Sequence, residues 1–340
     1  MLTKLIVENY KSIERAELYF SKINLLIGPN GSGKSSVLEG VELLISNLRQ
    51  GILIATIGGD ASLTGSSPPL KNFYRVVRNH DANRSIVVKG KFDQCEVRLK
   101  ATVDGTKLEV VTNNKFTPKE DFDVYFLKAN RRLLELLKGV LSNPREITTT
   151  NAHQLFYYAC YRTEFKENIQ MIREFYSRYG LHDVRWVPTE RPNEYEIIAT
   201  TPEGVDVNLA DAGAGLAALF PIVVALSFYP GGSTVFIEHP EMHLHPKLQY
   251  ELAEFLLMVL EKRNYQLIIE THSEHLLYGL LNAVAQKRLE PEELTVYSTR
   301  KERGKSVFGK MIVHEDGSLE GNLSDFLEAD IDAFLDWLKA

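Results

Sequence analysis

Hydrophobic residues recur along this chain with different spacings, and each spacing predicts a different kind of element. Runs that are apolar almost throughout, such as INLLIG at 23–28 and TVFIE at 234–238, predict short strands buried on both faces of a sheet. Alternation of apolar and polar residues between 73 and 112 predicts antiparallel hairpins, with a turn at VDG, 103–105. Apolar residues at helical spacing predict helices at 37–48, 131–142, 151–180, 215–229, 246–263 and 273–288.

The order of these elements predicts the architecture. Strands alternate with helices near both ends of the chain, which is typical of a largely parallel sheet covered by helices. We therefore predict an α/β fold in which 1–50 and 205–340 form one head, with a mixed sheet and helices on both faces. Residues 51–204 would form an inserted region of β-hairpins and helices, which begins with a loop at 51–70 rich in Gly, Ser and Pro. An amphipathic helix is expected at 326–338.

The composition is that of a globular protein. Of 340 residues, 44% are hydrophobic and 25% are charged. No stretch approaches the roughly 18 consecutive apolar residues of a membrane span, and the first residues lack the pattern of a secretory signal. We therefore expect a cytoplasmic protein that contacts no membrane. Cys95 and Cys160 form no CxxC pair, and both are expected to be ordinary buried thiols.

Charge is distributed unevenly. The formal net charge is -6, but residues 71–100 carry eight Lys and Arg against three acids, a local charge of +5. Residues 315–340 carry eight acids against one Lys, a local charge of -7. The basic segment predicts weak binding of DNA or RNA at most, and the alternative is that both segments are simply solvated surface.

The segment GPNGSGKSS at 28–36 contains the pattern GxxxxGK[ST] between a buried strand and an amphipathic helix, the context of a phosphate-binding P-loop. Glycines let the backbone turn so that its N–H groups point at phosphate oxygens, and the helix start adds partial positive charge. Lys34 would contact the β- and γ-phosphates of ATP, and Ser35 would supply a hydroxyl ligand to Mg²⁺. The residues predicted to bind the nucleotide are Gly28, Pro29, Asn30, Gly31, Ser32, Gly33, Lys34, Ser35 and Ser36.

A P-loop protein also needs an acid at the end of a second buried strand to hold the Mg²⁺ shell. Glu238 ends the strand TVFIE, so Ser35 and Glu238 are the predicted metal-binding residues, and Mg²⁺ is the predicted ion. The stretch FIEHPEMHLHP that follows is rich in acids and histidines.

The histidines of that stretch leave a second interpretation open. His239, His243 and His245 could bind a transition metal, because imidazole is a common zinc ligand. Pro240 opposes a continuous helix from His239 to His243, however, so their spacing does not place them on one face.

These segments resemble a known family. NYKSIERAELYFSKINLLIGPNGSGKSSVLEGVELL resembles the amino-terminal half of ATP-binding-cassette (ABC) heads of the RecF and SMC kind. FIEHPEMHLHP followed by IIETHSEHLL is similar to the carboxy-terminal half of the OLD-like branch, AAA-family ATPases common in bacterial and archaeal defence loci. The resemblance covers roughly 1–50 and 205–330 and implies a P-loop NTPase fold of the ABC-ATPase head type.

The resemblance also implies roles for individual residues. Glu238 matches the acid that organises the Mg²⁺-bound water, and His272 matches the switch histidine that senses the γ-phosphate, although it could instead be a capping or core histidine. The segment DAGAGLAALFP, 211–221, falls at the family's signature motif. Its Gly213 and Gly215 would begin a helix that completes the ATP site of a partner subunit.

The chain departs from the family pattern at several points. The signature segment has no Ser, no convincing Q-loop glutamine is present, and His239 stands where the most active heads carry the catalytic Glu. We therefore predict slow turnover, with Glu241 favoured over His239 as the group that positions the attacking water. No acidic cluster of the kind found in Toprim-type nucleases follows residue 288, so no such nuclease is expected in this chain.

The functional hypothesis is a cytoplasmic ABC-type ATPase whose ATP-driven homodimer, or higher homo-oligomer, controls a separate effector or partner protein. By resemblance its role would be anti-phage defence or genome maintenance. Two alternatives remain open: a nucleotide-binding scaffold or switch with little or no turnover, and a clamp ATPase of the DNA-repair type.

Overall fold

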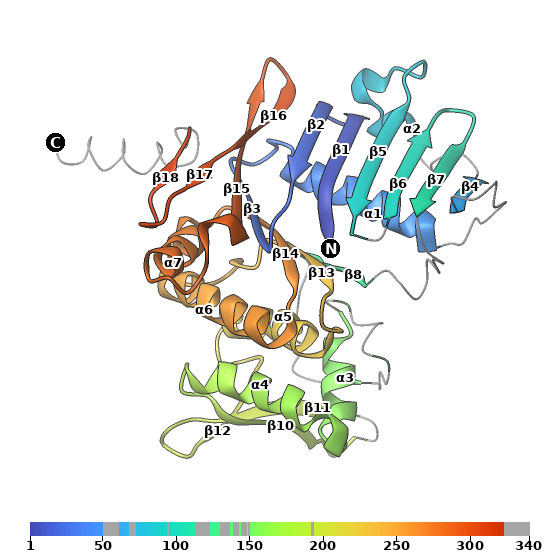
Figure 1. The fold of residues 1–340 in the computed structure, drawn as a ribbon. Coiled ribbons are helices and arrows are strands. Elements are labelled where there is room, and N and C mark those ends of the chain that lie inside the picture. The colour runs from blue at the N-terminus through green and yellow to red at the C-terminus, as the bar shows by residue number, and fades with distance from the viewer. Residues whose placement is uncertain are drawn as a thin grey trace, which may run out of the picture.

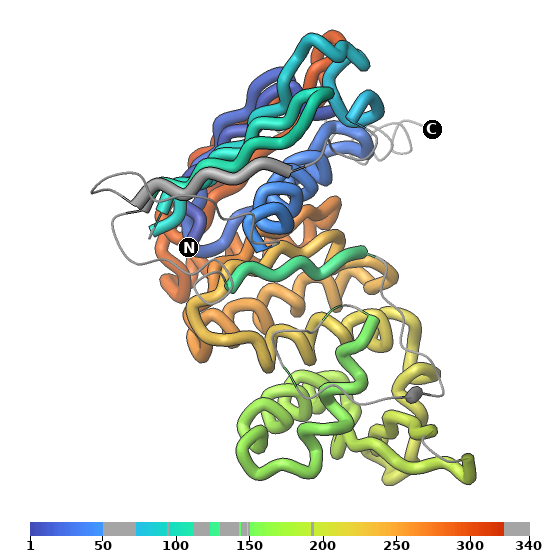
Figure 2. The backbone as a smooth tube through the Cα atoms, turned by 90° about the vertical axis from the view of Figure 1, so that its right-hand side faces the viewer, coloured from blue at the N-terminus to red at the C-terminus, as the bar shows by residue number. Residues whose placement is uncertain are grey.

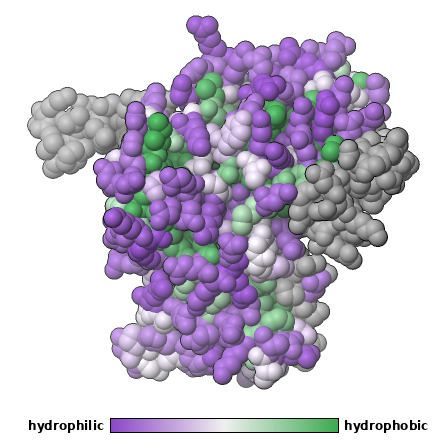
Figure 3. All heavy atoms as spheres, viewed as in Figure 1, coloured by the Kyte–Doolittle hydropathy of each residue, from purple (hydrophilic) through white to green (hydrophobic). Residues whose placement is uncertain are grey.

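The computed structural model describes residues 1–49, 61–67, 73–93, 95–112, 123–129, 137–138, 143, 148, 150–191 and 194–322. The described elements form stacked layers around one central sheet (Figure 1). Among the described residues, no helix is long and apolar enough to span a membrane. Hydrophilic side chains dominate the face shown in Figure 3, and apolar ones appear there in separate patches.

The central sheet holds the strands that the apolar runs predicted. In spatial order its strands are β16 (Lys305–Lys310), β15 (Leu294–Glu302), β3 (Ile23–Ile27), β14 (Gln266–Thr271), β13 (Thr234–Glu238) and β8 (Val124–Leu127). All neighbours pair in parallel except β15 and β16, so the sheet is mixed, as predicted. Every residue of β3 and β14 is buried, which explains why these strands show little alternation.

One face of this sheet packs against α1 (Lys34–Arg49) and a second, antiparallel sheet. The strands of that sheet, in spatial order, are β2 (Ile13–Tyr19), β1 (Leu2–Tyr10), β5 (Ile86–Phe92), β6 (Cys95–Ala101), β7 (Thr106–Thr112) and β4 (Ala61–Ser67). Leu26, Phe236 and Ile268 of the central sheet share one apolar core with α1 and these strands. Short helical turns, α2 (Phe73–Val76) and η1 (Arg78–His80), precede β5.

The opposite face is covered by α5 (Ala214–Phe228), α6 (Pro246–Arg263) and α7 (Glu274–Ala285). Alternate residues of β3, Leu25 and Ile27, enter this second core, because successive side chains of a strand point to opposite faces. Local signals explain two of the helix starts: Ser273 Oγ accepts from the N–H of Leu276, and Pro246 opens α6.

A further layer packs below these helices, as Figures 1 and 2 show. It consists of α3 (Ala152–Ala159), η3 (Thr163–Phe165), α4 (Lys166–Ser177), β10 (His182–Pro188), β11 (Glu194–Thr200), β12 (Asp206–Asn208) and β9 (Leu137–Lys138). The turn η4 (Pro291–Glu293) and the hairpin of β17 (Ile312–Val313) with β18 (Leu319–Glu320) complete the described elements.

Most predicted elements are confirmed, but three predictions are wrong. The helix expected at 151–180 is divided into α3 and α4, because the chain is extended at Arg162 and η3 lies between the two helices. The loop expected at 51–70 contains β4, which pairs antiparallel with β7; an edge strand needs only backbone partners, so its small side chains gave no signal. The helix expected at 131–142 fails at 137–138, where β9 pairs with β11. The helix predicted at 326–338 and the rest of 131–142 lie outside the described residues.

The segment 51–204 is spread over several layers. Its strands β4 to β7 extend the sheet of β1 and β2, and β8 forms an edge of the central sheet. Only the elements from β9 onward belong to neither of these two sheets, and they pack on the core of α5 to α7. The division into a head and one inserted domain therefore stays a prediction.

Candidate functional site

The P-loop connects β3 to α1 and is seated against β15 and β16. Gly28 and Gly33 have φ values of 143° and 114°. A Cβ atom at Gly28 would lie 2.1 Å from the carbonyl oxygen of Thr299, and one at Gly33 would lie 2.2 Å from Ser306 Oγ. Both positions therefore require glycine for conformation and for space.

The hydroxyl of Ser32 holds this loop in place. Thr299 Oγ1 donates to the Ile27 carbonyl (2.8 Å), so Ser32 Oγ donates to Thr299 Oγ1 at 2.7 Å. Ser32 is buried, as is Ser36, whereas Pro29, Asn30 and Gly31 are exposed. The exposed residues lie at the apex of the loop, and Ser32 acts there as an anchor.

Lys34 is folded under the P-loop and is 3% exposed. Its Nζ donates to the carbonyl oxygens of Gly28 (2.8 Å) and Pro29 (3.0 Å). Burial lowers the Lys34 pKa to about 8, although the carboxylates of Glu270 and Glu241 oppose the shift. A phosphate oxygen would replace these carbonyl oxygens as the acceptor of the Lys34 Nζ hydrogen bonds.

A buried acid that the sequence reasoning missed lies beside the P-loop. Ser35 Oγ donates to Glu270 Oε1 at 2.7 Å, and Glu270 is 2% exposed near the end of β14. Its second oxygen, Oε2, has no hydrogen-bond partner in the described part of the chain. The available signal was an acid within the otherwise apolar run QLIIETH.

His239 connects Glu270 to Glu241. His239 Nδ1 lies 3.3 Å from Glu241 Oε1, and Nε2 lies 3.4 Å from Glu270 Oε1. Hydrogen bonds to Glu241 and Glu270 raise the His239 pKa to about 9, so the imidazole is protonated near neutral pH. Its ring stacks on that of His272, with centroids 5.0 Å apart.

Glu241 and His272 complete this cluster. The His272 N–H donates to Glu241 Oε1 at 2.8 Å. Burial would raise the Glu241 pKa, but hydrogen bonds from His239 and the His272 backbone outweigh it and lower the pKa. Burial, aided by the charge of Lys34, lowers the His272 pKa, so this imidazole is neutral at pH 7. The P-loop therefore faces an acid pair, one imidazolium and one neutral imidazole.

Glu238 has different partners. Lys128 Nζ donates to Glu238 Oε1 (3.0 Å), and the backbone N–H of Ala129 donates to Oε2 (3.2 Å). Lys128 also pairs with Glu42 of α1. The predicted role of Glu238 in Mg²⁺ binding stays a prediction, because these contacts attach it to the segment after β8.

The predicted signature segment begins α5. Gly213, at the N-cap, and Ala214 are exposed, and no side chain caps the helix. Gly215 is buried, and a Cβ there would lie 2.8 Å from the His243 carbonyl oxygen. Gly215 thus allows close packing of α5 on the loop before α6, whereas Gly213 leaves the helix start accessible.

The three histidines of FIEHPEMHLHP make separate contacts. His239 joins the acid pair, while His245 Nδ1 accepts from the Lys247 N–H at the start of α6 (3.3 Å). His243 takes a left-handed conformation with φ 68°. Searched within the described ranges, groups of three or more His, Cys, Asp or Glu placed to hold a metal ion are absent.

Several cations of the basic segment 71–100 have local partners. Arg78 is 6% exposed and donates to the Ser12 carbonyl, while Arg84 pairs with Asp81. Arg98 lies 3.8 Å from Glu109. Nucleic-acid binding by this segment stays a prediction, and these contacts reduce the charge available for it.

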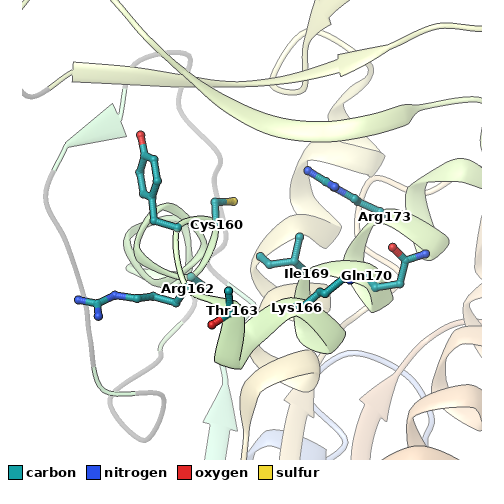
Figure 4. A pocket seen from close by; sticks show the side chains of 9 residues that line it. Cys160, Arg162, Thr163, Lys166, Ile169, Gln170 and Arg173 are labelled. Carbon is teal, nitrogen blue, oxygen red and sulfur yellow. The ribbon is translucent and has the colours of Figure 1, made fainter.

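A separate cavity of about 300 Å³ lies between α3 and α4, lined by Cys160, Arg162, Lys166 and Arg173 among others (Figure 4). Cys160 is half-buried, whereas Cys95 is buried as expected. Desolvation still raises the Cys160 pKa to about 12, so its thiol is a poor nucleophile. None of the lining residues belongs to the P-loop or the acid cluster.

Family comparisons cover most of the chain. The model described as "AAA ATPase domain" matches residues 1–179, more than half of the chain. The model described as "AAA domain, putative AbiEii toxin, Type IV TA system" matches residues 197–277.

Curated relatives agree with these matches. The OLD nuclease of Thermus scotoductus is 23% identical over 95% of this chain and 66% of its own length. The DNA replication and repair protein RecF of Yersinia enterocolitica is 50% identical over 44 residues, 13% of this chain and 12% of its own. The chain thus spans less than two thirds of each relative.

Solved structures confirm the fold. The SMC head domain from Thermotoga maritima has a TM-score of 0.53 at 13% identity, covering 91% of this chain and 98% of that one. An SMC head bound to the C-winged helix domain of ScpA has a TM-score of 0.58 at 14% identity, covering 92% and 98%. The predicted resemblance to OLD-like and RecF/SMC-type ABC heads is therefore confirmed.

Proposed function

Because the chain belongs to the AAA ATPase domain family, we propose that it binds ATP with Mg²⁺, hydrolyses ATP slowly and uses ATP-driven dimerisation to control a separate partner protein. The observation that carries the proposal is the contact between Ser35 of the P-loop and the buried Glu270. It places a carboxylate beside the hydroxyl that P-loop proteins use for Mg²⁺.

The residues present fit a magnesium nucleotide. Gly28, Gly31 and Gly33 take positive φ values, so the loop turns tightly just before Lys34 and Ser35, as a phosphate-binding loop requires. The unpartnered Glu270 Oε2 supplies acceptor capacity for a hydrated cation. When bound, Mg²⁺ would neutralise charge on the phosphates. Ser35 and an acid, Glu238 or Glu270, would hold it.

Slow hydrolysis follows from the acid cluster. Glu241 keeps a buried oxygen, Oε2, without a hydrogen-bond partner in the described part of the chain. We assign Glu241 the positioning of the attacking water, because the protonated His239 donates its N–H groups and cannot accept a proton. His272 is neutral and can donate one hydrogen bond toward a γ-phosphate.

Dimerisation is supported by the exposed start of α5. Gly213 and Ala214 are exposed, no side chain caps the helix, and a helix N-terminus favours an anion. A second subunit could therefore present its nucleotide to this helix. Two of the similar SMC-head structures hold a bound domain of ScpA, which supports control of a separate protein by this chain's dimer.

The biological role is proposed from the relatives. RecF is described as a DNA replication and repair protein, and one matching family is described as a putative toxin of a toxin–antitoxin system. Genome maintenance and defence are the corresponding roles for this chain.

The test measures ATP affinity and molar mass on the same protein. Wild type should bind ATP and gain mass by light scattering when ATP and Mg²⁺ are added, while Lys34→Ala should lose both responses. The matched control is Lys262→Ala, which removes a lysine from the last turn of α6, outside the P-loop, and should behave as wild type. A wild type that binds no ATP would refute the proposal, and unchanged mass with normal ATP binding would refute ATP-driven dimerisation.

A nucleotide-binding scaffold is the second candidate, favoured by His239. Its imidazolium stands where the related heads carry a catalytic carboxylate, and it neutralises the acids around it. ATP binding and ATP-dependent mass change without measurable phosphate release in a single-turnover assay would select this candidate.

A further inference from the structure

We propose that Glu270, rather than Glu238, is the acid that organises the hydrated Mg²⁺ beside Ser35. This inference rests on the proposed ATP binding, and it assigns the metal-positioning carboxylate to the strand next to the P-loop strand. It thereby replaces the assignment that the sequence alone suggested.

The first argument is sheet geometry. Glu238 and Glu270 are register partners on the parallel strands β13 and β14, so they stand at the same level of the sheet. β14 pairs directly with β3, with Glu270 opposite Leu26, whereas β13 is one strand further away. Since neighbouring strands lie about 4.8 Å apart, Glu270 begins one strand spacing closer to the P-loop.

The second argument is contact with the metal-binding hydroxyl. Ser35 Oγ donates to Glu270 Oε1 at 2.7 Å, although Ser35 itself is exposed and Glu270 is 2% exposed. A carboxylate this deeply buried is costly unless it is paired. Its Oε1 is satisfied by Ser35 and His239, but Oε2 has no hydrogen-bond partner in the described part of the chain. A hydrated cation at Ser35 would satisfy it.

The third argument is that Glu238 is engaged elsewhere. Both of its carboxylate oxygens accept hydrogen bonds, from Lys128 Nζ and from the Ala129 N–H. Lys128, which follows the edge strand β8 and also pairs with Glu42 of α1, therefore compensates the charge of Glu238.

A purely structural role for Glu270 gives a different expectation. As a structural group it would only accept the Ser35 hydrogen bond, and a glutamine amide oxygen can do the same. Glu270→Gln therefore preserves that hydrogen bond while removing the negative charge. Metal affinity separates the two roles, because only the metal-organising role requires the charge.

The experiment measures Mn²⁺ binding by electron paramagnetic resonance in the presence of a non-hydrolysable ATP analogue, and analogue binding in EDTA. The variants are Glu270→Gln, Glu238→Gln and, as matched control, Glu194→Gln, which alters a buried glutamate on β11. We expect Glu270→Gln to lower Mn²⁺ affinity roughly 10–100-fold. Its analogue affinity in EDTA should match wild type, and Glu194→Gln should match wild type in both measurements.

The outcomes separate the inference from the function on which it rests. Wild type that binds no analogue overturns both. If the analogue binds normally, three outcomes overturn only the inference. Mn²⁺ affinity is lost in Glu238→Gln but kept in Glu270→Gln, or it is lost equally in both variants, or it is also lost in the Glu194→Gln control. If thermal melting shows that Glu270→Gln does not fold, Glu270→Asp replaces it. That variant keeps the charge but withdraws it by one methylene, and an unchanged Mn²⁺ affinity there overturns the inference.

Discussion

The carboxyl ends of β13 and β14 each carry a glutamate at the same level of the central sheet, yet the two side chains enter different surroundings. At the β13 end, Glu238 pairs with Lys128, and both side chains keep contact with solvent. At the β14 end, Glu270 is buried among Ser35, His239 and the charge of Lys34.

The difference shows that position in the sheet decides the chemistry available to an acid. β13 pairs with the edge strand β8, and the residues after β8 provide the Lys128 ammonium and the Ala129 N–H as donors to Glu238. β14 pairs with β3, and the residues after β3 form the P-loop and provide the Ser35 hydroxyl as a donor to Glu270. Identical side chains thus become an ion-paired carboxylate at one end and a candidate metal-positioning carboxylate at the other.

The largest expected effect concerns the group that positions water at the β14 end. Glu241→Gln should slow single-turnover ATP hydrolysis by at least about 10²-fold, because it removes the acceptor for the proton of the water. ATP affinity, measured separately by fluorescence titration, should stay at the wild-type value. Wild-type hydrolysis in Glu241→Gln, together with loss in His239→Ala, would show that the roles of these residues are reversed.

A somewhat smaller effect on the hydrolysis rate is expected when the glutamates at the two strand ends, Glu270 and Glu238, are each replaced. Glu270→Gln should slow Mg²⁺-dependent hydrolysis roughly 10–100-fold, the usual range for an outer-shell metal partner. Glu238→Gln should slow hydrolysis less than Glu270→Gln. The measurement is hydrolysis rate against Mg²⁺ concentration, and a larger loss in Glu238→Gln would contradict the comparison.

The third effect concerns the seating of the P-loop, on which the β14 end depends. Gly33→Ala should lower the unfolding free energy by about 2 kcal/mol more than Gly31→Ala does. Only the Gly33 variant brings a Cβ within 2.2 Å of Ser306 Oγ. Backbone strain acts in the same direction, because φ is 73° at Gly31, near the left-handed helical region open to other residues, but 114° at Gly33. Urea unfolding of the two variants provides the comparison, and equal losses would show that β16 yields to the added methyl.

The smallest effect concerns the β13 end. Lys128→Met should lower the unfolding free energy by roughly 0.5–1 kcal/mol, because its ion pairs with Glu238 and Glu42 are both partly exposed and screened by solvent. ATP affinity and its Mg²⁺ dependence should not change. A loss of Mg²⁺ dependence in Lys128→Met would instead tie the β13 end to the nucleotide site.

Local sequence was sufficient wherever one segment carries the whole signal. The P-loop was predicted because its glycines, Lys34 and Ser35 are consecutive, and their spacing alone encodes the turn into α1. The buried strands β3 and β13 were predicted because strands covered on both faces are mostly apolar runs without alternation. The helices α5 to α7 followed from helical spacing in the same way.

The tertiary structure decided what depends on pairing between distant segments. The edge strand β4 has no apolar alternation and exists through its backbone bonds to β7, which no local pattern reveals. The buried acid beside the P-loop was missed for the same reason: sequence order marks Glu238 as the end of a buried strand, but strand order brings Glu270 to Ser35. Ser35 and Glu270 lie 235 positions apart along the chain, so strand order and register decided which of the two glutamates contacts Ser35.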